Sequence, residues 1–175
     1  RHPTKISKAY LFKLSFPIFF ANIAIPLVGL VDTGLMGHLS NSKFLAATSI
    51  STSVMTMILW SFGFLRMGTT GLIAQSLGKG DYREIVNIII RNLSIAILVG
   101  LAIILLKDWI ILIIFKYFSV SQETLLLIEK YISIRILSAP AELALYVIIG
   151  LYLGLQKTYI SSLIVASFCI VNIIL

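Results

Sequence analysis

Residues 26–34 read PLVGLVDTG and carry a single charged side chain, Asp32, inside an otherwise uncharged apolar run from residue 14 to residue 39. This run is longer than the roughly 20 residues that a helix needs to cross a bilayer. An acid at the centre of a membrane helix costs about 2.5 to 3.5 kcal/mol on insertion scales, and such residues usually face a polar cavity or a partner. The stretch therefore predicts a spanning helix in which Asp32 has a functional role.

The composition agrees with a membrane protein. Of the 175 residues, 59% are hydrophobic and 12% are charged, whereas soluble domains average roughly 45 to 50% and about 25%. Five apolar runs are long enough, or nearly long enough, to span a bilayer. We therefore expect an all-α, polytopic membrane helix bundle with helices over residues 14–39, 50–77, 85–106, 125–153 and 159–175.

The two ends of the sequence interrupt this pattern. The first residue is Arg1 rather than methionine, and the last apolar run stops at Leu175 without a cap, a flanking charge or an interfacial aromatic residue. From this we expect a piece that is cut at both ends. The first apolar run exceeds the ~7 to 15 residues of a signal-peptide core, so we expect it to persist as a helix.

The positive charges lie between the apolar runs. The net charge is +7, and cytoplasmic loops of membrane proteins carry an excess of Lys and Arg. This rule predicts a cytoplasmic N-terminus and a fifth helix that ends at the opposite face. The net positive charge is then explained by the topology in the membrane, and we expect no nucleic-acid partner. The residues on the predicted cytoplasmic side are Arg1, Lys5, Lys8, Lys13, Lys79, Arg83, Arg91 and Lys157.

Local signals place several helix ends. The glycines at 78 and 80 are expected to end the second helix, and Asp81 with Glu84 three residues later has the spacing of a capping box. Ser119 or Ser121 is expected to cap the fourth helix. These signals predict short connections rather than separate domains.

Two further stretches carry packing information. Residues 107–118 mix aromatic side chains with lysines, which suits a segment in the headgroup layer. Gly150 and Gly154 form a G-x-x-x-G pair, which would allow a neighbouring helix to approach closely.

The first apolar run also contains Pro17 and Pro26. Each proline removes a backbone donor and crowds the preceding turn, so this helix is expected to bend. A bend beside Asp32 suits alternating access, because protonation of the acid would change which conformation is preferred. The alternative is a static kink that only shapes packing.

Four other polar residues fall inside the predicted spans: Asn22, Arg66, Arg135 and Glu142. Arg66 precedes Gly78 by the same number of residues as Glu142 precedes Gly154, which places both charges at the same predicted depth. We therefore expect a structural ion pair between them. Arg135 is nearer the depth of Asp32. An ion pair between those two would keep the acid charged at neutral pH, whereas burial without a cation would favour its protonated form. Asn22 suits a hydrogen bond between helices, although a ligand role stays open.

The order of these residues resembles the multidrug and toxic compound extrusion (MATE) family, and within it the DinF-like branch. The resemblance rests on residues 17–39, on FLRMGTTGLIAQ at 64–75, on residues 134–141 and 150–156, and on Asn172. It covers almost the whole sequence. It implies a twelve-helix protein with two related six-helix lobes, of which this chain would be the first five helices and the second lobe would be missing.

The resemblance also implies roles for individual residues. Asp32 would be the cation-coupling residue and Asn172 would help to line the same cation site, while Asn22, Thr33 and Tyr131 are candidate cavity-lining residues. A second acid found in many family members would fall at position 176. The coupling ion therefore stays open between a proton and sodium, with a candidate sodium site near Asp32 and no other metal.

The expected function is cation-coupled antiport that exports amphipathic or cationic drugs and other small molecules by alternating access. We expect no enzymatic activity, no cofactor, a monomeric full-length protein and a location in a bacterial inner membrane. His2 and His38 lack the partners of a catalytic site. The alternatives are a lipid-linked oligosaccharide flippase of the same superfamily and a structural or receptor protein without transport.

Overall fold

The computed structural model describes residues 15, 16, 19, 42–118 and 121–174. Within these residues the chain forms helices and no strands, which confirms the all-α prediction. Nearly all of the predicted helix over residues 14–39 lies outside the described residues.

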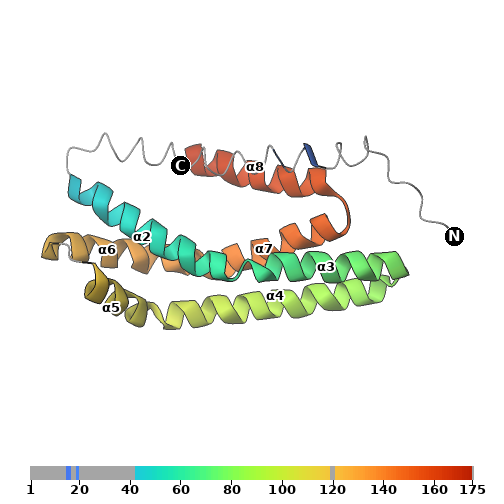
Figure 1. Ribbon diagram of the computed structural model, residues 1–175, viewed down its shortest axis with the longest axis horizontal. Coiled ribbons are helices and arrows are strands. Elements are labelled where there is room, and N and C mark those ends of the chain that lie inside the picture. Colours follow the sequence, from blue (N-terminus) through green and yellow to red (C-terminus); the bar gives the residue numbers. More distant parts are fainter. Residues whose placement is uncertain (1–14, 17–18, 20–41, 119–120, 175) are drawn as a thin grey trace.

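The helices run roughly along one long axis (Figure 1). Among the described elements, α5 and a 3₁₀ turn called η1 are the shortest. Their bounds are α2 (Ser42–Ser61), α3 (Phe64–Lys79), α4 (Tyr82–Leu105), α5 (Lys107–Tyr117), α6 (Gln122–Arg135), η1 (Ile136–Ser138), α7 (Ala139–Gly154) and α8 (Thr158–Ile174).

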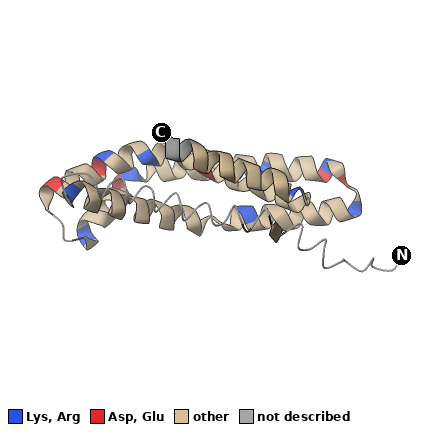
Figure 2. Cartoon of the chain, turned by 90° about the horizontal axis from the view of Figure 1, so that it is seen from above, with Lys and Arg blue, Asp and Glu red and all other residues tan. Residues whose placement is uncertain are grey.

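Within the described part of the chain, three stretches are long and apolar enough to cross a membrane. They cover Lys43–Lys79, Tyr82–Leu105 and Gln122–Gly154, with 37, 24 and 33 residues, against the roughly 20 that a span requires. Charged residues gather toward the two ends of the described bundle and are sparse along its middle (Figure 2). This distribution is the one expected of a polytopic membrane protein.

Two of the three stretches are broken near their middle. The first break lies at Phe62 and Gly63, between α2 and α3, where the amides bond three residues back, to the carbonyls of Leu59 and Trp60. The second break is η1, between α6 and α7. Pro140 follows it and has no amide hydrogen for the helical ladder. The predicted runs 50–77 and 125–153 are thus each divided, and the first of these helices begins at residue 42.

The halves of the broken stretches pack in pairs. α2 lies against α6, and α3 lies against α7, while the unbroken α4 packs on both α3 and α7 (Figure 1). The largest core cluster lies where these helices meet. Its fully buried members are Met55, Leu59, Leu65, Ala96, Ile103, Ile136, Ala139, Leu143 and Val147.

The predicted helix ends are confirmed where they are described. α3 ends at Lys79, and Gly80 adopts the left-handed conformation with φ of 72° that glycine reaches at little cost. The Asp81 carboxylate accepts a 3.0 Å hydrogen bond from the Glu84 amide at the start of α4. Ser121 caps α6 and accepts a hydrogen bond from the amide of Thr124.

Candidate functional site

The predicted cation site is only partly within the described residues. Asn172 lies in the last turn of α8, and only its backbone is described. Its pairing with Asp32 therefore stays a prediction. The other site predictions outside the described residues are Pro17, Asn22, Pro26, Asp32 and Thr33.

Tyr131 is the candidate cavity residue whose side chain is described. It lies on α6, is half-buried, and its hydroxyl oxygen is 3.4 Å from Thr52 Oγ1 on α2. A contact of this length between hydroxyls is weak. Tyr131 therefore joins α6 to α2 loosely and precedes Arg135 by about one helical turn.

Arg135, Ser138 and Glu142 form a polar cluster across the second break. Arg135 Nη1 donates to both Ser138 Oγ and Glu142 Oε1. Ser138 Oγ also lies 2.7 Å from the Arg135 carbonyl oxygen and 2.8 Å from Glu142 Oε1. The side chains of Arg135 and Glu142 are 37% and 21% exposed. The cluster neutralises two charges inside an apolar stretch and connects α6 to α7 through side chains.

The expected ion pair between Arg66 and Glu142 is wrong, because Glu142 pairs with Arg135. The reason is the register between α3 and α7. The Arg66 backbone lies against Gly150, which is eight residues from Glu142, or about 12 Å along a helix. Arg135 and Glu142 are seven residues apart, about two turns, and η1 brings them together. The rival contact between Arg135 and Asp32 lies outside the described residues.

Gly150 and Gly154 allow α3 to approach α7 closely, as the G-x-x-x-G spacing predicts. A Cβ on Gly150 would lie 2.7 Å from the Arg66 carbonyl oxygen, and one on Gly154 would lie 2.8 Å from Ile73 Cβ. Thr70 Oγ1 also lies 3.2 Å from the Gly150 carbonyl oxygen. Small residues at such contacts are a common means of packing helices in membranes.

A second close approach holds α4 against the second break. A Cβ on Gly100 would lie 2.4 Å from Pro140 Cα and 2.7 Å from its nitrogen. The missing side chain at Gly100 therefore lets α4 lie directly on the first turn of α7, next to the break. This contact was not expected from the sequence.

A buried hydrogen bond between α4 and α3 was also missed. Asn92 Nδ2 donates to Thr69 Oγ1 over 2.8 Å, and the Thr69 hydroxyl lies 2.6 Å from the Leu65 carbonyl oxygen. Asn92 is 8% exposed. The available signal was an amide in the middle of an apolar run, since such residues usually bond across helices.

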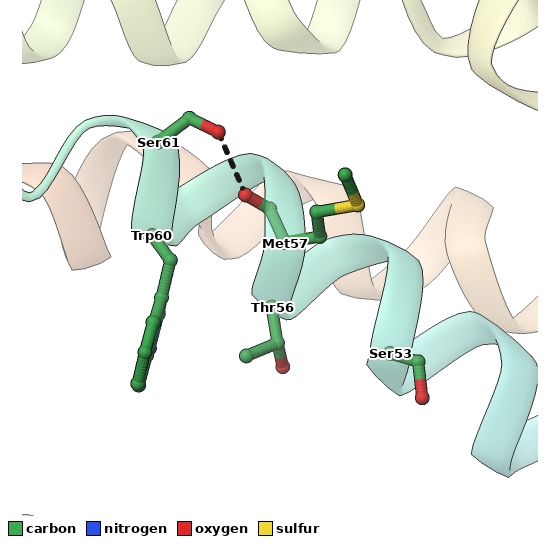
Figure 3. A pocket seen from close by; sticks show the side chains of 5 residues that line it. All are labelled: Ser53, Thr56, Met57, Trp60 and Ser61. Atoms are coloured by element: carbon green, nitrogen blue, oxygen red, sulfur yellow. Dashed lines mark hydrogen bonds between the residues drawn. The ribbon is translucent and has the colours of Figure 1, made fainter.

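One face of α2 carries hydroxyls beside exposed apolar side chains and is not covered by other described residues. Ser53, Thr56, Met57, Trp60 and Ser61 line an open hollow of about 550 Å³. In Figure 3, Ser53, Thr56 and Trp60 point to the same side of α2, and the Ser61 hydroxyl donates to the Met57 carbonyl oxygen over 2.9 Å. Hydroxyls combined with an exposed tryptophan suit a surface that meets both water and apolar groups.

The segment 107–118, expected in the headgroup layer, forms the short helix α5 and Phe118. Ile111 and Ile114 are buried, while Trp109, Leu112 and Tyr117 are exposed. One side of α5 thus packs on the bundle, and the other side presents aromatic and aliphatic groups. Its residence in the headgroup layer stays a prediction.

A family model matches almost the whole chain. The MatE family model aligns with residues 17–175. No solved structure gives a significant match.

Several curated bacterial proteins are similar to parts of this chain. The "DNA damage-inducible protein F" of Escherichia coli is 34% identical over 165 residues, which is 94% of this chain and 36% of the relative. The "Probable multidrug resistance protein NorM" of Acinetobacter baylyi is 31% identical over 90 residues, or 51% of this chain and 20% of that relative. The "Uncharacterized transporter YisQ" of Bacillus subtilis is 29% identical over 93 residues, or 53% and 20%. The chain thus matches about a third of the length of the first relative and a fifth of the other two.

Proposed function

This chain belongs to the MATE family, and we propose that it is the N-terminal part of a cation-coupled antiporter that exports amphipathic or cationic small molecules. Support comes from relatives whose names describe multidrug resistance proteins. The mechanism we propose is alternating access, in which the substrate and the cation compete for one conformational equilibrium. The energy source is the cation gradient, since one charge that crosses the membrane gains about 2.3 kcal/mol per 100 mV.

Asp32 is the observation that carries this proposal. It is the single charged side chain in an apolar run of 26 residues, from 14 to 39. An acid inside a membrane span is energetically costly, and such residues usually mark functional sites. Protonation or sodium binding at Asp32 would neutralise the charge and favour one bend of the proline-containing first helix. A cationic substrate would then compete with the coupling cation for the same acid.

The described helices support the proposal in a second way. α8, which carries Asn172, packs against α7, and α6, which carries Tyr131, connects to α7 through η1. In our proposal Asn172 completes the cation site with Asp32, and Tyr131 lines the adjoining cavity with Asn22 and Thr33. The hydroxyl-bearing face of α2 would then belong to a wet surface rather than to a lipid-facing one.

The topology follows from the charge distribution. We propose a cytoplasmic N-terminus in a bacterial inner membrane, because Lys79, Arg83 and Lys157 lie in or next to short connections on one predicted side. In our proposal the complete protein acts as a monomer, and the coupling ion is a proton or sodium.

The central experiment compares Asp32→Asn with the wild type in the full-length protein at matched membrane abundance. Asn keeps the size of the side chain and removes its charge, so we expect loss of efflux driven by an imposed proton or sodium gradient. Asp108→Asn is the matched control, because Asp108 is an exposed acid at the start of α5. Wild-type efflux by Asp32→Asn would overturn the proposal.

The flippase alternative requires cationic side chains that are free to hold an anionic lipid headgroup. Arg135 is engaged by Glu142, which leaves Arg66 as the other intramembrane cation discussed above. This pairing favours export of amphipathic or cationic molecules. A receptor or structural role predicts no gradient-driven flux in the same assay.

A further inference from the structure

Both breaks border the same core cluster. Leu59 and Leu65 flank the first break, and Ile136 and Ala139 lie in and after the second, and all four are buried in that cluster. The breaks therefore meet inside one packed region rather than at the surface. A change in the angle at one break would have to be accommodated at the other.

The breaks divide this bundle into two halves, which we name the α2–α6 half and the α3–α4–α7 half. Within the second half the contacts are tight, because Gly150, Gly154 and Gly100 bring backbones together. Within the first half, buried apolar side chains, an exposed ion pair between Lys43 and Glu123 and the 3.4 Å contact of Tyr131 with Thr52 join the two helices. The α2–α6 half also contacts α5 through the core residues Ala47, Ile111 and Ile128.

The Arg135 cluster lies where the two halves join. Arg135 is the last residue of α6 and Glu142 is in the first turn of α7, so their ion pair connects the halves directly. Ser138 lies between them and contacts both. Since η1 replaces the regular helical ladder between α6 and α7, side-chain bonds carry more of the angular restraint here than inside an unbroken helix.

We propose that Arg135, Ser138 and Glu142 are positioning residues that fix the angle between α6 and α7, and with it the placement of Tyr131 relative to α8 during transport. The role in transport rests on the function proposed above, whereas the angle can be measured without it. The cluster acts through the geometry of the helices that carry the proposed cavity.

Distances between spin labels test the angle in the full-length protein in lipid, in a background without native cysteines. One label replaces Leu126 on α6 and the other replaces Val86 on α4, two exposed positions on opposite sides of the second break. A reference pair places labels at Val86 and Leu72, both within the α3–α4–α7 half. The angle is changed by Glu142→Gln, and the control Lys43→Gln removes the ion pair inside the other half.

We expect Glu142→Gln to increase the share of molecules whose distance between positions 126 and 86 lies outside the main wild-type peak. The expected increase is about threefold to tenfold, the range that loss of one intramembrane polar contact supports. The reference pair should keep its distribution, and Lys43→Gln should leave both pairs unchanged. The charge-exchanged variant, Arg135→Glu with Glu142→Arg, should move the population back toward the wild type. Such recovery would not follow if Glu142 acted alone.

Two results would overturn the inference. One is an unchanged distribution in Glu142→Gln, and the other is an exchanged variant as broad as Glu142→Gln. If Glu142→Gln does not reach the membrane, Arg135→Gln gives the same reading, because it removes the cation that pairs with Glu142 from the other side of the break.

The transport readout separates positioning from simple stability. At matched abundance, Glu142→Gln should lower the maximal rate of efflux by a larger factor than it changes the substrate KM, since a lost positioning contact acts first on the conformational step. A wild-type rate of efflux in a variant with an altered distance distribution would contradict the role in transport. The restraint of the angle between α6 and α7 by the cluster would still stand.

Discussion

The contact between α3 and α7 and the contact between α2 and α6 solve the same packing problem by different means. α3 meets α7 through glycines, with a hypothetical Cβ on Gly150 only 2.7 Å from a backbone carbonyl. α2 meets α6 through apolar side chains, one exposed ion pair and a 3.4 Å hydroxyl contact. The first contact has no room for an added atom, whereas the second is made by side chains, from the buried Ile128 and Ile132 to the exposed ion pair.

This difference indicates which half tolerates change. Backbone contacts at glycine resist any displacement, because a shift of a fraction of an ångström creates overlap or a void. Long side chains at an exposed contact adapt at small cost. We therefore expect the α3–α4–α7 half to set the stability of the bundle and the α2–α6 half to permit movement.

The largest expected effect is at the glycine contact. Gly150→Ala together with Gly154→Ala should lower the free energy of unfolding by about 1 to 3 kcal/mol per site, the usual cost of overpacking. Membrane abundance and the melting temperature of the full-length protein would measure this loss. Gly71→Ala is the matched control, since a Cβ there has nothing within 4 Å. Equal melting of the double variant and the control would remove the distinction between the two contacts.

A single close approach at Gly100 should give a comparable effect at one site. Gly100→Ala places a methyl group on the backbone of Pro140, where a Cβ would lie 2.4 Å from Cα. We expect a loss of about 1 to 3 kcal/mol, seen as early unfolding of the detergent-solubilised protein. Gly68→Ala, at a position on α3 with open space, should melt like the wild type. A neutral Gly100→Ala would mean that α4 does not brace the break.

An intermediate effect is expected for the buried amide. Asn92→Leu removes the hydrogen bond to Thr69, a type of contact worth about 0.6 to 2 kcal/mol between membrane helices. The exposed Asn87 on the same helix supplies the control Asn87→Leu. Melting curves that shift equally for both variants would contradict the assignment of Asn92 as a link between α4 and α3.

The smallest effects are expected in the α2–α6 half. Tyr131→Phe removes a weak 3.4 Å contact with Thr52, and the melting temperature should stay within the experimental error of the wild type. Gradient-driven efflux is measured in parallel, because loss of a cavity-lining hydroxyl would lower efflux without lowering stability. A drop in melting as large as that of Asn92→Leu would show that this half is as rigid as the other.

Much of the fold could be predicted from the length of the apolar runs and from local chemistry. Helix ends at Gly80, Asp81 and Ser121 follow from short-range rules, and the close approach at Gly150 and Gly154 follows from spacing alone. These features depend on residues that are near one another in the sequence or repeat along one helix face.

The predictions failed where the register between helices decides the contact. Arg66 and Glu142 were matched by depth, but α3 extends beyond α7, and the actual partner of Glu142 is Arg135 on its own stretch. The break at Phe62 and Gly63 has no nearby proline from which it could have been predicted. Both features arise from tertiary packing, which a count along a single helix does not contain.

The most direct test of the central claim records cation flow caused by substrate in vesicles that contain only the full-length protein. An outward substrate gradient should drive protons or sodium in the opposite direction in the wild type. With Asp32→Asn, reconstituted at equal density, the same gradient should move neither cation. Cation counterflow of wild-type size in Asp32→Asn would contradict the claim that Asp32 couples the cation to export.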